Sequence, residues 1–335
     1  MVKNAAIPAG QGPFFEDLTV GAKFASAPGV TLTDGLAAAR QAITGDRLAL
    51  ALDHELCLAV TGGGPLAPPA LVWDVAIGQS TVVTRQVRAN LFYRGLAFRR
   101  VPVLGDTLHT CTQVVGLRQN KPRPGRGPTG LAALRITTTD QDDRPVLDFF
   151  RCAMLPLRDQ NRDTGHADDL DLIGTDAPGP DIDALLGGWR LDRFGHQDGG
   201  PRAAVLRPGQ QFSAASGDVV SSAPELARLT LNVAAVHHDA EAAGGQRLVY
   251  GGHTIGLALA QAARVLPSLV TVAGWHGCEH LGPVHEGDTL RSVIDVERVD
   301  LLPDGGGLVH LRSLVRADGE PGRDVLDWRY IAVVA

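Results

Sequence analysis

Apolar and polar residues alternate along three stretches near the C-terminal end of the chain, as they do in half-buried antiparallel strands. These stretches run from 290 to 299, from 308 to 316 and from 325 to 333. Three comparable stretches lie earlier, at 109–119, 131–140 and 146–157. The pattern therefore predicts two sets of three strands.

A short internal repeat precedes each set of strands. Pro102-Val-Leu-Gly-Asp-Thr-Leu108 recurs as Pro283-Val-His-Glu-Gly-Asp-Thr-Leu290, with one extra residue in the second copy. Upstream, Gly21-Ala-Lys-Phe24 resembles Gly209-Gln-Gln-Phe212. Because the two matches keep the same order and a similar spacing, the repeat indicates that one structural unit has been duplicated.

Helices are predicted ahead of the second set of strands. Ser222-Ala-Pro-Glu225 has the form of a capping box and predicts a helix to about residue 231. A longer helix is predicted from about 254 to 266, entered through Gly251-Gly252 and ended before Pro267. Alanine and leucine lie on nearly every side of it, so we expect it to be enclosed. An enclosed helix wrapped by an antiparallel sheet is the hotdog arrangement, and two copies predict an α+β double hotdog.

The length of the chain also favours two units, because 335 residues exceed one ordinary core. The segment 158–207 is dense in Asp, Gly and Pro, which predicts a linker with one short helix near 182–186. The expected organisation is an N-terminal hotdog at 1–157, this linker, and a C-terminal hotdog at 208–335.

Composition narrows the classes of function. A formal net charge of −6 gives no overall attraction to nucleic acid or to anionic lipid. The four cysteines are far apart, so we expect reduced thiols and a cytoplasmic location. Residues 1–15 hold no apolar run typical of a signal peptide, and the apolar stretch 254–272 is interrupted by polar residues and proline, so neither secretion nor a membrane span is expected.

The segment 231–239, Leu-Asn-Val-Ala-Ala-Val-His-His-Asp, carries the most informative motif. It resembles the signature of the MaoC-like, or R-specific, enoyl-CoA hydratases: His237 and Asp239 match, and Asn232 stands at the acidic position. Further stretches resemble the branch of mesaconyl-CoA hydratase, also called β-methylmalyl-CoA dehydratase, in which asparagine tends to precede the histidine. They lie at 89–93, 115–121, 232–237, 249–253, 279–280 leading into 287–289, and 325–327.

The resemblance implies a double hotdog that reversibly hydrates a 2-enoyl-CoA to a 3-hydroxyacyl-CoA, with coenzyme A as part of the substrate and no other cofactor. It also implies that His280, just ahead of the repeated turn, contacts the substrate. Glu279 stands where the branch is expected to have arginine, so the resemblance implies the type of reaction and leaves the acyl group open.

The chemistry of hydration requires the same residue types. Water must be activated by a base, and the enolate-like oxygen must be stabilised by donors. Histidine exchanges protons near neutral pH, so His237 is the candidate base, and the Asn232 amide is expected to hold the water or the hydroxyl. Gly251 and Gly252 offer backbone N–H groups at a helix N-terminus, with Tyr250 beside them.

The first half lacks the candidate base and the glycine pair. Its comparable segment 44–51 keeps Asp46 but has Ala51 in place of the histidine, and Pro68-Pro69 replace the glycine pair. We therefore expect one site per chain, with the first half shaping the tunnel for the acyl group and coenzyme A.

Two further groups of residues are considered as binding sites, one for coenzyme A and one for a metal. Arg118, Lys121 and Arg123, followed by Arg126, either belong to a solvated hairpin or meet the phosphates of coenzyme A. His253, His276, His280 and His285 fit no zinc spacing, so no metal is expected.

Two other functions stay open on sequence alone. A thioesterase would need an acid aimed at the carbonyl carbon, for which Asp218 and Asp239 are the available residues. A non-catalytic acyl-CoA binding protein would agree with the missing acid at position 232. In each case the partner is a small-molecule acyl-CoA, and self-association into a homo-oligomer is expected.

Overall fold

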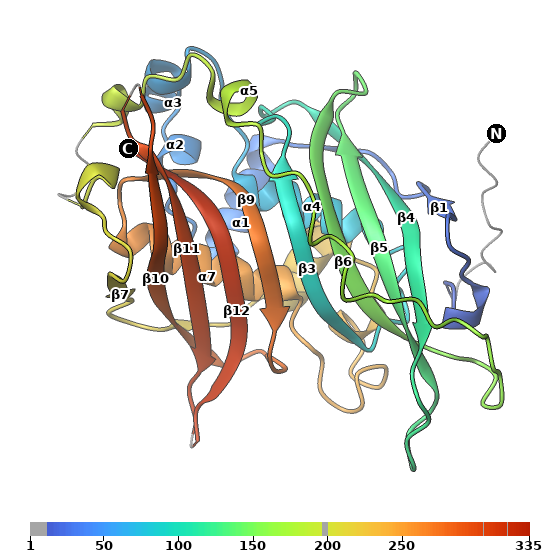
Figure 1. Cartoon of the computed structure of the whole chain (residues 1–335). Coiled ribbons are helices and arrows are strands. Elements are labelled where there is room, and N and C mark those ends of the chain that lie inside the picture. The colour runs from blue at the N-terminus through green and yellow to red at the C-terminus, as the bar shows by residue number, and fades with distance from the viewer. Residues whose placement is uncertain (1–11, 196–199, 304, 320) are drawn as a thin grey trace.

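The computed structural model of the chain describes residues 12–195, 200–303, 305–319 and 321–335. Its centre is one antiparallel sheet of 12 strands, ordered β1-β4-β5-β6-β3-β9-β12-β11-β10-β7, with β2 and β8 paired beside β4 and β10. Figure 1 shows the helices behind this sheet and an irregular yellow-green segment across its front. The two predicted sheets are thus joined into one, and the fold is the expected double hotdog.

The elements of the first half are β1 (Lys23–Phe24), β2 (Val30–Thr31), α1 (Asp34–Thr44), α2 (Ala49–Leu52), α3 (His54–Thr61), α4 (Pro69–Ser80), β3 (Ala89–Phe98), β4 (Thr107–Gln119), β5 (Thr129–Thr139) and β6 (Pro145–Pro156). After α5 (Ile182–Leu186), the second half has β7 (Gln211–Ser213), β8 (Asp218–Val219), α6 (Ala223–Leu229), α7 (Gly251–Val265), β9 (Leu269–His280), β10 (Thr289–Leu301), β11 (Gly307–Ala317) and β12 (Arg323–Val334). Short 3-10 helices lie at Phe15–Asp17, Leu191–Phe194, Ala203–Val205 and Ala235–His237.

All six strands predicted from alternation are confirmed, each within two residues at either end. The repeated Gly-Asp-Thr-Leu segment leads into β4 in the first half and into β10 in the second. The upstream repeat also keeps its place, because β1 pairs with β4 and β7 pairs with β10. The repeat in the sequence is therefore a repeat of strand pairing.

The alternation pattern missed two long strands, β3 and β9, as well as the short strands β1, β2, β7 and β8. The first seven residues of β9, 269–275, are all buried, so their sequence does not alternate. Strand β3 is interrupted by Gly95, whose φ of +59° accompanies an irregular register with β6. These strands pair with each other, from Tyr93 opposite Cys278 to Ala97 opposite Gly274, and so join the halves.

Helix starts were only partly predicted. The short helix Ile182–Leu186 is confirmed, and the long helix α7 is buried along its length but begins three residues earlier than predicted, at Gly251. The predicted capping box at Ser222 is wrong. Ser222 has a φ of +57° and its side chain caps nothing; the N–H of Ala223 instead donates to the Glu286 carboxylate, and Glu225 pairs with Arg228.

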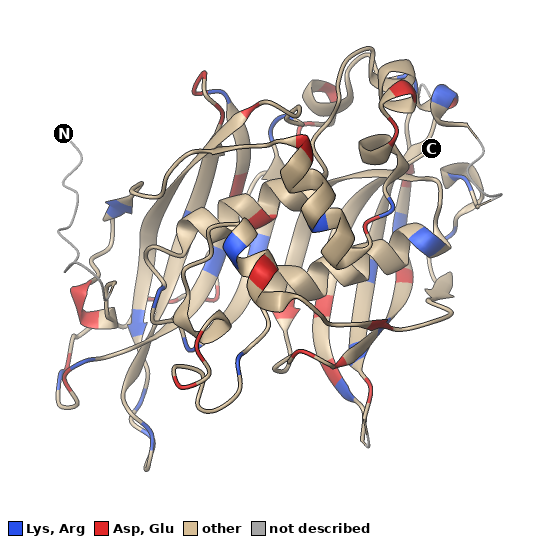
Figure 2. Ribbon diagram, turned by 180° about the vertical axis from the view of Figure 1, so that it is seen from behind, with Lys and Arg blue, Asp and Glu red and all other residues tan. Residues whose placement is uncertain are grey.

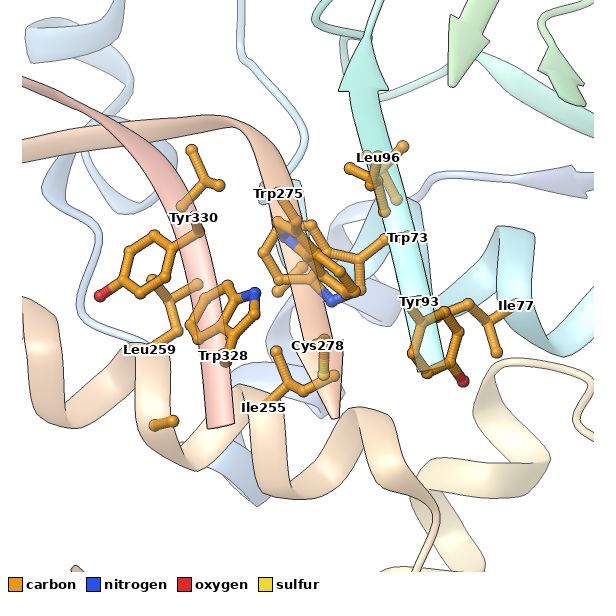
Figure 3. Packing of buried hydrophobic residues seen from close by; sticks show 14 of the residues in the cluster. Trp73, Ile77, Tyr93, Leu96, Ile255, Leu259, Trp275, Cys278, Trp328 and Tyr330 are labelled. Carbon is orange, nitrogen blue, oxygen red and sulfur yellow. The ribbon is translucent and has the colours of Figure 1, made fainter. Parts of the chain in front are cut away.

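An aromatic cluster fills the seam between the halves. Trp73 of α4 contacts Trp275 of β9 and Trp328 of β12 edge to face, with ring centroids 5.0 and 6.1 Å apart. Figure 3 shows these rings between the sheet and α7, with Tyr93 of β3 close by. Because large aromatic side chains bury much apolar area, the cluster fixes α4 of the first half against strands of the second.

The described part of segment 158–207 packs on the opposite face of the sheet rather than hanging free. One Nη of Arg94 on β3 donates to the carbonyls of Leu170, Asp171 and Ile173, and the Asp168 carboxylate accepts the N–H of Leu117. The proposed division of the chain at 157 and 208 stays a prediction.

Two expectations about the whole chain can be compared with the described residues. All four cysteines carry free thiols, as expected. Among the helices that the structure describes, none combines the length and the hydropathy that crossing a bilayer would require.

Helix α4 approaches the second half most closely at Gly78. A Cβ atom there would overlap the carbonyl oxygen of Thr230 and lie 3.2 Å from the backbone nitrogen of Asn232. Both atoms belong to the backbone, so the segment that carries Asn232 could not move aside cheaply. The backbone angles of Gly78 are ordinary for a helix, so other residues could adopt them. Glycine is required here because the two backbone segments lie too close together for a Cβ atom.

We expect Gly78→Ala to lower the free energy of unfolding by about 1–3 kcal/mol, because a methyl group forces two backbone segments apart. The matched control is Gly35→Ala in the exposed first turn of α1, where the nearest atom to a Cβ is 3.7 Å away. Alanine is the better helix former, so the control should be neutral or more stable by up to about 1 kcal/mol. Urea denaturation compares the two variants, and equal stabilities would contradict the proposed contact.

Candidate active site

A cavity of about 370 Å³ opens at the seam between the two halves. The first half contributes the end of α4, the start of β3 and one residue of β6; the second half contributes the 232–237 segment, the start of α7 and the end of β9. Four residues singled out from the sequence line it with Tyr250: His237, Asn232, Gly251 and His280. The sheet pairing thus brings these separate segments to one enclosed space.

His237 ends a 3-10 helix and has a defined tautomer. Its Nδ1 lies 2.9 Å from the carbonyl oxygen of Leu248, and because a carbonyl can only accept, Nδ1 must carry the proton. Nε2 of the neutral ring is then a free lone pair. Burial lowers the pKa of His237 to about 4, and the charge of His238 acts in the same direction, so the ring is neutral at pH 7.

Asn232 is buried and turns one end of its amide to its own backbone. Its Oδ1 accepts the N–H of Ala234 at 3.0 Å, so Nδ2 is the end left to act, and it can only donate. The segment is anchored on the first half, since the N–H of Val233 donates to Thr81 Oγ1 at 2.9 Å. Asn232 is therefore a fixed donor rather than a second base.

Gly251 is the first residue of α7 and lines the cavity. First-turn N–H groups of a helix have no intrahelical acceptor and carry the positive end of the helix dipole. A Cβ at Gly251 would collide with the imidazole of His280, so glycine allows the histidine to lie directly over the helix start. The arrangement offers a backbone donor to a developing anion.

Gly252 and Tyr250 have positions different from those expected. Gly252 does not line the cavity; a Cβ there would collide with the Asp74 carboxylate and the Tyr250 ring, so the residue serves close packing. Tyr250 presents its ring to the cavity, while its hydroxyl donates to Asp74 Oδ1 at 3.1 Å. Asp74 in turn accepts Arg40 Nε at 2.8 Å, and Arg40 also pairs with Asp46.

His280 lies at the end of β9, with its ring edge to face with Tyr93 at 6.0 Å. In the described part of the chain its Nε2 is buried without a hydrogen-bond partner. Burial lowers the pKa of His280 to about 4, with a further contribution from His237. The adjacent Glu279 is exposed and does not line the cavity, so its carboxylate is not placed to contact a ligand there.

Two cavity residues were missed by the sequence analysis, Arg151 of β6 and Asn90 of β3. Arg151 occupies an apolar position of a strand, between the buried Phe149 and Ala153, and that charge was the available signal. Asn90 lies within the stretch 89–93 that resembles the mesaconyl branch, but nothing in its spacing pointed to a site.

A second, larger cavity of about 980 Å³ adjoins the first, since Arg88 lines both. Its cationic side chains include Lys121, Arg123, Arg126 and Arg158. Figure 2 shows the basic residues along the protruding β4–β5 hairpin. Arg118 does not line this cavity, and its backbone pairs with Ala167 in an isolated β-bridge, so its assignment to coenzyme A stays a prediction that the cavity does not support.

The two carboxylates considered for thioester hydrolysis, Asp218 and Asp239, lie outside the cavity. Asp218 is paired with Arg264 at 2.5 Å, and the exposed Asp239 accepts the N–H of Glu241; neither lines the cavity. Within the described ranges, no cluster of three or more His, Cys, Asp or Glu side chains could hold a metal ion. His253 is enclosed in α7, while His276 contacts His310 at 2.7 Å.

Comparison with known proteins gives relatives over nearly the whole chain, although no protein-family model matches it. β-Methylmalyl-CoA dehydratase of Chloroflexus aurantiacus is 29% identical over 329 residues, covering 95% of this chain and 91% of that protein. Mesaconyl-CoA hydratase of Cereibacter sphaeroides is 27% identical over 328 residues, covering 92% and 90% respectively.

Two solved structures share the fold over their full length. A conserved hypothetical protein of Mycobacterium tuberculosis with a double hotdog fold has 56% identity and a TM-score of 0.91, covering 96% of this chain and 98% of that one. A protein of Chloroflexus aurantiacus described as a MaoC domain dehydratase has 25% identity and a TM-score of 0.86, covering 98% and 99%.

Fold and site together define a double hotdog protein with one histidine-lined cavity at its seam. The chain belongs to the MaoC-like double hotdog family of hydratases and dehydratases, as the resemblance of its motifs implied.

Acid sensitivity is predicted from His253, which is fully buried in the first turn of α7. Burial lowers its pKa to about 4, whereas the unfolded chain titrates near 6.5. Between these values the unfolded state binds the extra proton, so the free energy of unfolding falls as the pH falls. From pH 7.5 to 5 this residue should account for a loss of about 2 kcal/mol.

We therefore expect His253→Leu to lose less stability than the native chain between pH 7.5 and 5 in urea denaturation. His54→Gln, at an exposed histidine of α3, is the control and should keep the native difference. A pH dependence that His253→Leu leaves unaltered would contradict the assignment.

Proposed function

We propose that the chain catalyses the reversible hydration of a 2-enoyl-CoA to a 3-hydroxyacyl-CoA. The observation that carries the proposal is the convergence of a neutral imidazole, His237, and a helix N-terminus, Gly251, on one cavity. The first supplies proton transfer and the second supplies a donor for negative charge, and a hydro-lyase acting on a thioester needs both.

In this proposal the Nε2 lone pair of His237 accepts a proton from water as the water oxygen attacks the β-carbon. The Nδ1–H bond to Leu248 keeps the ring oriented and fixes which nitrogen is basic. Asn232 donates through Nδ2 to the water oxygen, leaving the other lone pair of that oxygen for the attack. In the dehydration direction the same two groups hold and protonate the departing hydroxyl.

Attack at the β-carbon places negative charge on the thioester oxygen as an enolate, and the protonated His237 then returns its proton to the α-carbon, which completes the addition of water and restores the neutral ring. The Gly251 N–H, at the positive end of the 15-residue helix α7, is placed to donate to that oxygen. His280 lies over the same glycine and is neutral near pH 7, so it can donate a hydrogen bond without adding a charge. We assign it to substrate contact, as the motif implied.

For the acyl group we propose mesaconyl-CoA, hydrated to β-methylmalyl-CoA, on the basis of the names of the two relatives that match over most of the chain. The exposed position of Glu279 supports this choice, because the charge that differs from the expected arginine lies outside the cavity. Coenzyme A enters as part of the substrate, and self-association of the chain stays a prediction.

The larger basic cavity is the proposed site for the nucleotide of coenzyme A. Lys121, Arg123 and Arg126 of the β4–β5 hairpin bring positive charge to a space adjoining the reaction cavity. Phosphates are commonly bound by such side chains, whereas the chain as a whole carries a net charge of −6. Arg88, which lines both cavities, marks where the pantetheine arm would pass.

Thioester hydrolysis is less well supported by the site. Neither Asp218 nor Asp239 lines the cavity, so no carboxylate among the described lining residues could attack a carbonyl carbon or direct water to it. A purely binding role would not account for the free Nε2 of His237.

We expect His237→Gln to lower kcat/KM for mesaconyl-CoA by about 100- to 10,000-fold, because the side chain is similar in size but is not a base. Loss of enoyl-thioester absorbance measures the reaction, and a thiol assay separates it from hydrolysis. His109→Gln, at an exposed histidine of β4, is the control and should retain native activity. Native protein that binds acyl-CoA but turns over no enoyl-CoA would instead establish a binding role.

For the double variant Lys121→Ala/Arg123→Ala we expect KM for CoA thioesters to rise about tenfold, the equivalent of roughly 1.4 kcal/mol of binding. The same acyl group on N-acetylcysteamine, which lacks the nucleotide, should react equally well with native and variant protein. Arg118→Ala is the matched control on the same hairpin and should change neither KM. An equal loss for both thioesters would place these residues outside the nucleotide site.

A further inference from the structure

The buried Arg151 has no place in the proton chemistry described above. It lies on β6, directly opposite Tyr93 of β3, and only 3% of its surface is exposed. Its side chain lines the cavity that holds His237 and Gly251. A buried arginine is costly unless it meets an anion, so its partners decide its role.

The hydrogen bonds of Arg151 go to neutral groups. One Nη donates to Thr84 Oγ1 at 2.8 Å and to the carbonyl of Ser80, the last residue of α4, at 3.3 Å. Its Nε is buried without a partner in the described part of the chain. No Asp or Glu of the described residues forms an ion pair with it.

Arg40 provides an internal comparison. It is buried to 1% exposure, as deeply as Arg151, but pairs with two carboxylates, Asp74 at 2.8 Å and Asp46 at 3.2 Å. Arg40 lines a different, smaller cavity, and there the protein itself supplies the carboxylates that neutralise it. Arg151 lines the cavity of His237 and Gly251 without such a carboxylate.

Asn90 adds a second unsatisfied group to the same cavity. Both its Nδ2 and its Oδ1 are buried without a partner among the described residues. It lies three positions before Tyr93 on β3, the strand that pairs with the strand of Arg151. A guanidinium that has no carboxylate partner and an unpaired Nε, together with an unpaired amide, fits a planar anion with several acceptor oxygens.

We propose that Arg151, assisted by Asn90, binds a free carboxylate at the far end of the acyl group, and so selects dicarboxylic enoyl thioesters over monocarboxylic ones. The assignment rests on the proposed function and names its specificity-determining residues. A substrate carboxylate would supply the missing counterion of Arg151. A monocarboxylic acyl group of the same length would leave the charge unpaired, which disfavours it.

Arg151 also has a structural contact, because its bond to the Ser80 carbonyl caps the end of α4. Loss of activity alone would not separate the two roles. The test therefore compares two ligands that differ in the terminal carboxylate, so that a general loss of structure affects both.

Binding is tested first with succinyl-CoA and butyryl-CoA, saturated thioesters that hydration cannot consume. By titration calorimetry the native chain should bind succinyl-CoA at least about tenfold more tightly. Arg151→Gln should abolish that preference, while Arg118→Gln, at a residue that lines neither cavity, should keep it. Equal affinity of the native chain for the two esters would overturn the proposal without any variant, even if Arg151→Gln failed to fold.

Turnover is tested next with mesaconyl-CoA and crotonyl-CoA. Arg151→Gln should lower kcat/KM for mesaconyl-CoA by about 100-fold and leave crotonyl-CoA nearly unchanged, and Asn90→Ala should act in the same direction with a smaller effect. Equal losses on both substrates would assign Arg151 to the structure of α4 and overturn the proposal. If the native chain prefers succinyl-CoA but hydrates neither ester, the carboxylate site stands and the proposed hydration fails.

Discussion

The pairing of β3 with β9 is the interaction on which the rest of this structure depends. It joins two hotdog units into one sheet, and the cavity exists only where they meet. Close contact is built into the seam: a Cβ at Gly274 would meet the backbone carbonyl of Leu96 at 2.5 Å, and Trp73 lies against two tryptophans of the other half. Backbone contact and aromatic packing together allow little relative movement of the two halves.

This constraint gives a role to the first half, which has Ala51 and Pro68-Pro69 at the positions comparable to the histidine and the glycine pair. It positions the second half at three points: Gly78 against Thr230, Thr81 Oγ1 on the N–H of Val233, and Asp74 on the hydroxyl of Tyr250. It also contributes cavity residues of its own. The first half thus holds the second in place and completes its cavity.

Much of the fold was predictable because repeats and alternation are local properties of a sequence. The six alternating strands and α7 followed from them, but β3 and β9 did not, because strands covered on both faces lose the period of two. The capping box at Ser222 failed because tertiary contact with Glu286 overrode the local pattern. The resemblance brought out His237, Asn232, Gly251 and His280, which share one cavity in the structure. Arg151 was missed because one charged residue in a buried strand does not by itself indicate a binding site. The structure was needed to show that its Nε is buried without a partner.

The distribution of charge around the cavity bears on how a thioester would be held. Near the reacting carbons the side chains are neutral, because burial keeps His237 and His280 unprotonated at pH 7. Positive charge is supplied instead by Arg151 in the same cavity and by the basic cavity that adjoins it at Arg88. A ligand with phosphates at one end and a carboxylate at the other would be anchored at both, which fixes its direction and leaves little freedom at the double bond between them. Such anchoring contributes to rate through orientation, and it lets a weakly basic imidazole act on a substrate already aligned for attack.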